Sequence, residues 1–368
     1  MAAPSPSLLA VIKVGSSSVT RADGDIDDAA LAKLCGDLAA AREAGHAIVL
    51  VLSGAVAAGL PALGMARRPS DIGTLQAIAA VGQPRLYARV AAVLEAHGIV
   101  AGQVLLTPHD FISRSQYLHA RETLRRLLEL GVMPVVNEND TIADDEIRYG
   151  DNDRLAALVS HLLDARTLVL LTDTGGLFTA DPGIDSGASL IEEILEVDAA
   201  LEAVAGGSRS AAGSGGMASK LAAGKIAAWS GVRAVIASAG TEGVVLDALE
   251  GRAVGTVIQP RGQRLASRKL WIAFARGAAG RIVVDAGARE ALMHRGRSLL
   301  PAGVRAVEGN FDVDDAVEVV GPDDRAFAKG LSRYRAHTLG TVLGRRTGDL
   351  PEGAPHEVIH RDDLVMLP

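Results

Sequence analysis

Short runs of branched apolar residues alternate along the chain with longer segments whose apolar residues recur every three or four positions. Leu8–Val14 predicts a buried strand, and Asp27–Ala44, with leucines at helical spacing, predicts a helix. Further strands are predicted at Ile48–Leu52, Val100–Leu106, Val132–Val136, Leu168–Leu171 and Ala234–Ala237, and helices at Ile72–His97, with a break near Gly82–Pro84, and at Ser115–Leu130. This alternation predicts an α/β fold, an open and mostly parallel sheet between layers of helices.

The pattern changes near residue 260. Gln259–Arg268 is polar and basic, which is typical of a linker. Short strand-like runs follow at Trp271–Phe274, Arg281–Asp285, Ala316–Val320 and Ala326–Gly330, with one convincing helix at Ala288–Gly296. We therefore expect an α/β domain over residues 1–260, a linker over 261–275, a small β-rich domain over 276–356 and a C-terminal tail over 357–368.

Composition narrows the class of protein. Hydrophobic residues make up 48% and charged residues 22% of the 368, as in a globular protein, and the net charge of −7 disfavours general nucleic-acid affinity. The single cysteine, Cys35, excludes an intrachain disulfide and suits a reducing cytoplasm. Ala47–Met65 is uncharged and long enough to span a bilayer, but its Ser, Gly and Pro residues predict a strand, a turn and a helix start instead.

Ligands of such sheets bind in the loops at the carboxyl ends of strands, and the first two loops there are suited to anions. Lys13 ends a predicted strand, and Gly15 and Ser16 could present backbone N–H groups to phosphate oxygens. Ser53 follows the second strand at a predicted helix start, another position that favours anions. Each motif alone is weak evidence for a binding site. A solvent-exposed lysine at a strand end, or a serine that only caps a helix, would produce the same sequence pattern.

Acidic and amide residues crowd two later positions. Asn137-Glu138-Asn139-Asp140 follows a strand that should be central, and Gly150–Asp153 opens the next helix. Such loops can bind an ammonium group, an amide or Mg²⁺. Farther on, Thr172 and Asp173 end a buried strand before a Gly-rich loop that could hold a base and ribose.

A second glycine-rich stretch, residues 213–216, leads into a helix through Lys220. Its N–H groups and Lys220 suit a β- or γ-phosphate, although it is not a Walker A loop, because Ser219 precedes the lysine and Leu221 follows it. All these motifs lie on successive predicted strand ends. Their common location is a stronger indication of an active site than any single motif.

In order and spacing, the motifs VIKVGSS, SGAVAAG, NEND, GDND, LLTDTGGLFTADP and GGMASK resemble those of the amino acid kinase family over nearly the whole chain. NEND with GDND is typical of the branch that uses ATP to phosphorylate the γ-carboxylate of L-glutamate to L-glutamyl 5-phosphate, the first step of proline biosynthesis. The segment GRIVVDAGAREAL…GRSLLPAGVRAVEGNF resembles a PUA domain.

The resemblance implies a role for each motif. Lys13, Lys220 and Asp153 would be catalytic, with Asp153 holding the two lysines, and Ser53, Asp140 and Asn152 would bind glutamate. ATP would contact residues of three segments, namely Lys13, Gly15, Ser16, Thr172, Asp173, Ser214, Gly215, Gly216, Met217, Ala218, Ser219 and Lys220. Mg²⁺ would be held mainly by the ATP phosphates, with no protein ligand assigned. The resemblance also implies feedback inhibition by proline and a homo-oligomer (dimer or tetramer). The cysteine content and the interrupted apolar segment lead us to expect a cytoplasmic location and no membrane partner.

Three alternatives stay open at this stage. The protein could be a related kinase acting on N-acetylglutamate, aspartate or a nucleotide. It could be an RNA-binding protein led by the PUA-like module, although that role needs a basic groove and aromatic stacking residues, for which the sequence gives little sign. It could also be an amino-acid sensor that has lost catalysis.

Overall fold

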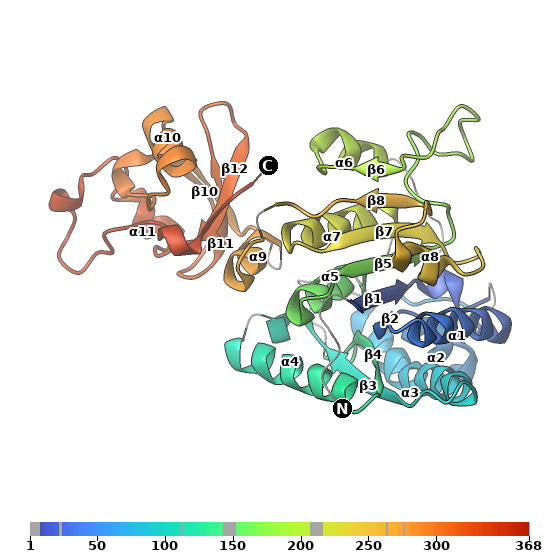
Figure 1. Cartoon of the computed structure of the whole chain (residues 1–368). Helices are drawn as coiled ribbons and strands as arrows, with labels where there is room; N and C mark the ends of the chain where they lie inside the picture. The colour runs from blue at the N-terminus through green and yellow to red at the C-terminus, as the bar shows by residue number, and fades with distance from the viewer. Residues whose placement is uncertain are drawn as a thin grey trace. The chain divides into compact units, whose positions relative to one another are not determined.

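The computed structural model describes residues 8–21, 24–111, 113–142, 152–206, 216–262, 264–274 and 277–367. The chain divides into two compact units, Met1–Arg264 and Leu265–Pro368. Each unit has its own sheet and its own apolar core. Figure 1 shows both as ribbons.

Unit 1 contains one eight-stranded sheet, in the order β3-β4-β2-β1-β5-β7-β8-β6. Its strands are β1 (Leu9–Val14), β2 (Ala47–Leu52), β3 (Ala101–Leu106), β4 (Met133–Glu138), β5 (Thr167–Thr172), β6 (Glu193–Ile194), β7 (Arg233–Ser238) and β8 (Thr256–Ile258). Neighbours are parallel except β7 and β8. The predicted strands of this unit are confirmed to within one or two residues.

Helices cover both faces of this sheet (Figure 1). They are α1 (Asp28–Glu43), α2 (Ala55–Gly59), α3 (Ile72–Ala96), α4 (Arg114–Glu129), α5 (Asn152–Leu163), α6 (Ala199–Gly206), α7 (Met217–Trp229) and α8 (Val244–Glu250). Helices α1, α3 and α8 pack on one face, and α4, α5 and α7 contact the strands from the other. The predicted α/β sandwich is confirmed, but the predicted break near Pro84 is wrong, because α3 runs through that proline without ending.

A close crossing of α2 and α3 fixes the loop after β2. A Cβ on Gly82 would lie 1.8 Å from the carbonyl oxygen of Ala55, and one on Gly59 would lie 2.2 Å from that of Ile78. Only glycine permits such an approach of two backbones. The crossing therefore sets where α2 begins, directly after Ser53 and Gly54.

Unit 2 contains a five-stranded sheet in the order β10-β9-β11-β12-β13. Its elements are α9 (Ser267–Phe274), β9 (Gly280–Val284), α10 (Ala286–Arg295), β10 (Val304–Gly309), β11 (Ala316–Val320), β12 (Ala326–Leu331), α11 (Ala336–Gly340) and β13 (Leu364–Met366). The predicted strand at Trp271–Phe274 is wrong, because these residues end helix α9. No described helix of the chain is long and apolar enough to cross a membrane.

The order of the strands in the sheet indicates where a ligand site should lie. From β1 the chain moves outward to β2, and after β3 and β4 it returns to β5 on the other side of β1. Loops that leave β1 and β5 in opposite directions open a crevice at the carboxyl ends of these strands. Lys13 and Thr172 lie at those two strand ends.

Candidate active site at the carboxyl ends of the central strands

A cavity of about 640 Å³ lies at this crevice. Of the residues predicted for the site, eleven line it: Lys13, Gly15, Ser16, Ser53, Asp140, Asn152, Thr172, Asp173, Gly216, Met217 and Lys220. Asp153 and Ser219 lie behind this lining and contact Lys220 or its neighbours, whereas Ala218 is in the first turn of α7 without lining the cavity. Ser214 and Gly215 lie outside the described residues.

Two lysines and one aspartate form the centre of the site. The Nζ atom of Lys13 lies 2.6 Å from Oδ1 of Asp153, and the Nζ atom of Lys220 lies 3.4 Å from Oδ2 of the same carboxylate. All three residues are at most 4% exposed. The cluster carries a net charge of +1 and lies beside a cavity of the size that ligands occupy, an arrangement suited to an anion.

The fold explains why these three residues meet. Side chains of a strand alternate between its faces, and in β1 Ile12 belongs to the core on the α1 side. Lys13 therefore points to the opposite face, where α5 packs on β1 and α7 packs on α5. Asp153 is in the first turn of α5 and Lys220 in the first turn of α7, so both helices present their N-terminal ends to Lys13.

Electrostatics keeps the Asp153 carboxylate ionised despite its burial. Burial would raise the pKa of Asp153, but Lys13, Lys220 and a hydrogen bond from Ser219 outweigh it and hold that pKa below its usual value. Burial lowers the pKa of Lys220, and the charge of Lys13 adds to this, whereas the Asp153 carboxylate opposes it. The carboxylate is therefore what allows two cations to stay together out of water.

Ser219 orients the carboxylate. Its Oγ atom lies 2.6 Å from Oδ2 of Asp153 and 2.8 Å from the carbonyl oxygen of Gly216. The hydroxyl thus connects Asp153 to the beginning of α7. We infer that Ser219 acts on the lysines through Asp153.

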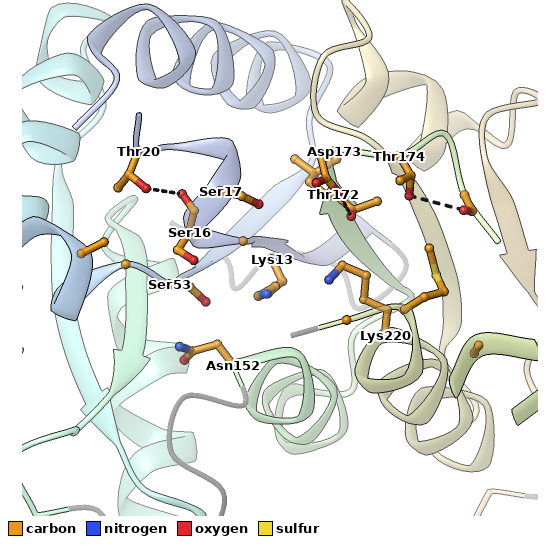
Figure 2. Close-up of a pocket in the computed structure, with 18 of the residues that line it drawn as sticks. Lys13, Ser16, Ser17, Thr20, Ser53, Asn152, Thr172, Asp173, Thr174 and Lys220 are labelled. Carbon is orange, nitrogen blue, oxygen red and sulfur yellow. Dashed lines mark hydrogen bonds between the residues drawn. The ribbon is translucent and has the colours of Figure 1, made fainter. Parts of the chain in front are cut away.

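Figure 2 shows the ammonium groups of Lys13 and Lys220 in the middle of the pocket, with Ser16, Ser53 and Asn152 on one side of them and Thr172, Asp173 and Thr174 on the other. The loops after β1 and β2 are in contact, because a Cβ on Gly54 would lie 3.7 Å from that of Ser16. Gly54 has φ 118°, a conformation that glycine adopts readily. The pocket thus has two ends with the lysines between them.

The end near Ser53 holds the buried polar residues of the β4 loop. The backbone N–H of Glu138 lies 3.2 Å from Oδ1 of Asn152 and 2.8 Å from Oδ1 of Asn137, and Nδ2 of Asn137 donates to Oε1 of Gln83 at 2.7 Å. These hydrogen bonds join α3, β4 and α5. They hold Asn152 at the cavity wall.

Asp140 lies at this same end of the network and is 7% exposed. Burial raises the pKa of its carboxyl group to about 6, and the positive charge of Arg68 partly opposes that rise. A buried carboxylate at a cavity wall is a suitable partner for a cationic group of a ligand, since pairing offsets the cost of its burial.

The other end combines polar and apolar surfaces. The Oγ1 atom of Thr172 donates to Asp173 at 3.0 Å, and the carbonyl oxygen of Thr172 accepts from the N–H of Ala239 at 2.7 Å. Leu177, Val204 and Ala205 also line the cavity. Apolar walls beside a few fixed polar groups suit a flat, partly polar ring system.

Sequence reasoning missed several lining residues. Arg68 lies in the loop before α3, and Val204 and Ala205 belong to α6. In the sequence Arg68 is a charged residue between two helical segments. Most residues of this kind are exposed to solvent and have no functional role, so the sequence does not single it out. In the part of the chain that the structure describes, no three His, Cys, Asp or Glu side chains are grouped to hold a metal ion.

Comparison with known proteins agrees with this geometry. Residues 9–238 match the model of the amino acid kinase family, and residues 280–351 match that of the PUA domain. The chain therefore belongs to the amino acid kinase family, and a PUA domain follows its kinase region.

The curated relatives narrow the branch. Glutamate 5-kinases of Pelobacter propionicus, Moorella thermoacetica and Frankia casuarinae are 43%, 44% and 48% identical to this chain. Each match covers 97% of this chain and 96–97% of the relative. A solved isopentenyl phosphate kinase is 22% identical, with a TM-score of 0.49 over 68% of this chain and all of its own, a likeness too weak to bear on function. The similarity to glutamate 5-kinases thus extends through both units.

Proposed function

We propose that this protein transfers the γ-phosphoryl group of ATP to the γ-carboxylate of L-glutamate, producing L-glutamyl 5-phosphate and ADP, as the first step of proline biosynthesis. The observation that carries the proposal is the Lys13–Asp153–Lys220 cluster, buried between two ends of one cavity. The names of its relatives, alike over 97% of the chain, support the choice of substrate.

The chemistry needs no general base. A glutamate γ-carboxyl group has an unperturbed pKa of about 4.3, so it is already ionised at neutral pH. One of its oxygens attacks the γ-phosphorus, a new P–O bond forms, and the P–O bond to the β-phosphate breaks as ADP leaves. Catalysis then depends on positioning and on stabilising the negative charge of the equatorial phosphoryl oxygens.

Lys13 and Lys220 would supply this stabilisation from the middle of the pocket, between the two substrates (Figure 2). Because Asp153 already holds both ammonium groups, little reorganisation is needed when the transferring phosphoryl group arrives. Asp153 is a positioning residue in this scheme. Ser219 orients its carboxylate.

The two ends of the cavity would take the two substrates. Glutamate would bind near Ser53, Asp140 and Asn152, with its ammonium group on the Asp140 carboxylate. The ATP phosphates would contact the backbone N–H groups of Gly15 and Ser16 and those of residues 214–219. The ammonium group of Lys220 would contact them as well. The base and ribose would lie near Thr172 and Asp173, against Leu177 and Val204.

Mg²⁺ fits this scheme as part of the ATP complex. It prefers oxygen ligands, which the β- and γ-phosphates provide, and Asp173 adds a carboxylate to the same cavity. When bound, it would neutralise charge on the phosphate oxygens.

The test is ATP turnover with Mg²⁺ and hydroxylamine, offering L-glutamate, N-acetyl-L-glutamate and L-aspartate in parallel. Hydroxylamine converts an acyl phosphate to a hydroxamate, so a hydroxamate with glutamate alone is the expected result. The Lys13→Ala variant serves as the inactive control. A hydroxamate formed with another acid would show that this acid, and not glutamate, is the substrate. If no acid yields a hydroxamate, the proposed reaction is refuted.

Several further properties stay predictions. They are inhibition by proline at the glutamate end of the pocket, a dimer or tetramer, a cytoplasmic location, and no role of the PUA domain in RNA binding. We also propose that the kinase domain spans residues 1–260 and the PUA domain 276–356, joined by the segment 261–275 and followed by the tail 357–368. Light scattering, and turnover assays with added proline, test the oligomer and the inhibitor.

A further inference from the structure

Arg68 lines the cavity but takes no part in the phosphoryl transfer described above. It lies between Gly64 and Asp71, in the loop that joins the α2 region to α3, and its side chain is exposed. It lines the same cavity as Ser53, Asp140 and Asn152.

Two opposite charges, Arg68 and Asp140, line this cavity and act on one another. Asp140 is a buried carboxylate, and among the charged groups around it Arg68 is the one whose charge opposes the effect of burial on its pKa. A free α-amino acid carries an ammonium group and a carboxylate on one carbon atom. Two opposite protein charges at one cavity wall are the complement of that pair.

The other cations that line the described part of the cavity have different positions. Lys13 and Lys220 are bound to Asp153 in the centre, where the phosphoryl group would be transferred. Arg21 pairs with Asp25 at 3.2 Å, and both side chains are more than half exposed. Arg68 differs from these cations in lining the cavity together with Asp140 and acting by its charge on that carboxyl group.

We propose that Arg68 binds the α-carboxylate of the amino-acid substrate while Asp140 binds its ammonium group, so that the two residues together select a free α-amino acid. The inference rests on the proposed function, because it assigns a substrate group at the same site. A guanidinium is well suited to this role, since its planar fork can form two parallel hydrogen bonds with a carboxylate.

The decisive experiment compares L-glutamate with its 1-amide, in which the α-carboxylate is replaced by a neutral carboxamide and the γ-carboxylate is kept. We expect Arg68→Gln to lower kcat/KM for glutamate about 10- to 100-fold, mainly through KM, the effect of losing charged hydrogen bonds. The value for the 1-amide should change less than about threefold. The preference for glutamate over the 1-amide should therefore collapse.

A second substrate separates the two charges. 4-Aminobutyrate is glutamate without its α-carboxylate, so Arg68→Gln should leave its kcat/KM nearly unchanged, whereas Asp140→Asn should lower it. Arg67→Gln is the matched control, because Arg67 is the exposed neighbour that does not line the cavity. Arg68→Lys should recover part of the preference.

The failures are distinguishable. If Arg68→Gln lowers turnover of glutamate and the 1-amide equally, Arg68 shapes the loop and the inference is overturned. If the preference collapses in Arg21→Gln instead, Arg21 holds the α-carboxylate. If the wild-type protein makes no hydroxamate from glutamate, the proposed function fails, and calorimetric binding of glutamate and the 1-amide still decides the role of Arg68.

Discussion

At the scale of single residues, Asp153 is what makes the site possible. It is 1% exposed, and both lysines depend on its one carboxylate for compensation of their buried charges. Removing the only anion of this buried cluster leaves two cations uncompensated, and leaving a buried charge without its partner is strongly destabilising.

Asp153→Asn should therefore destabilise the protein as well as inactivate it. We expect the free energy of unfolding to fall by about 3–5 kcal/mol, because two buried ammonium groups would lose their counter-charge. Urea unfolding followed by circular dichroism measures it. A loss below about 1 kcal/mol would show that the lysines do not need this carboxylate for burial.

Lys220→Ala should separate catalysis from stability. We expect kcat to fall about 100- to 1000-fold with KM for glutamate changed less than threefold, since the interaction lost is one made with the transition state. Stability should hold, because the cluster loses one of two like charges. Lys225→Ala is the control on the same helix, where Lys225 pairs with Glu202 at 2.7 Å away from the cluster. A loss expressed through KM alone would contradict the assigned role.

Asp140 should impose a pH dependence on glutamate use. Its pKa is raised to about 6, and only the ionised carboxylate can bind an ammonium group. We expect kcat/KM for glutamate to fall about tenfold per pH unit below pH 6, with no such inflection in Asp140→Asn. The stability of the fold should depend on pH in the opposite direction, because burial favours the protonated form of this carboxyl group. The stabilisation from this group is complete below its unfolded pKa near 3.8 and is lost as pH rises through about 6.

At the scale of elements, the crossing of α2 and α3 is the contact that places the Ser53–Gly54 loop. Gly82→Ala would drive a Cβ into the carbonyl oxygen of Ala55, so α2 must shift. We expect a loss of about 2–3 kcal/mol together with a raised KM for glutamate. Gly36→Ala in α1 is the control, since a Cβ there meets nothing within 4 Å and should stabilise by about 0.5–1 kcal/mol. Thermal unfolding of both variants checks the contrast.

The central strands were predictable because parallel strands buried on both faces form continuous apolar runs, as in Ala47–Leu52 and Thr167–Thr172. Helix α9 was not, because the run Trp271–Phe274 is too short to show a helical period. The short strands β6 and β8 depend on pairing across the sheet, which no local pattern encodes.

The residues of the candidate site also divide into those that the sequence pattern predicts and those that depend on tertiary packing. Lys13, Ser53 and Thr172 were predictable because each directly follows or ends a strand whose position was already clear. The contacts of Lys13 and Lys220 with Asp153 depend on how α5 and α7 pack, so only the resemblance suggested them. Arg68 was missed because it lies in a loop without periodicity.

At the scale of the whole molecule, the described cavity residues all belong to unit 1, between Lys13 and Lys220. Unit 2 has a separate core around Ile282, Val319 and Leu339. We therefore expect a chain ending at Arg264 to keep kcat and both KM values within about threefold of the full protein. Turnover and gel filtration of this truncation test the prediction. A folded but inactive truncation would show that unit 2 contributes to catalysis.

The cluster at the centre of the site also constrains when activity can arise during synthesis. Its three residues come from β1, α5 and α7, so the ammonium group of Lys13 leaves the ribosome long before its counter-charge and Lys220 follows last. Contacts between such distant segments form only after the intervening chain has collapsed around them. A chain arrested before α7 would thus be catalytically silent, however well β1 to β5 had already assembled.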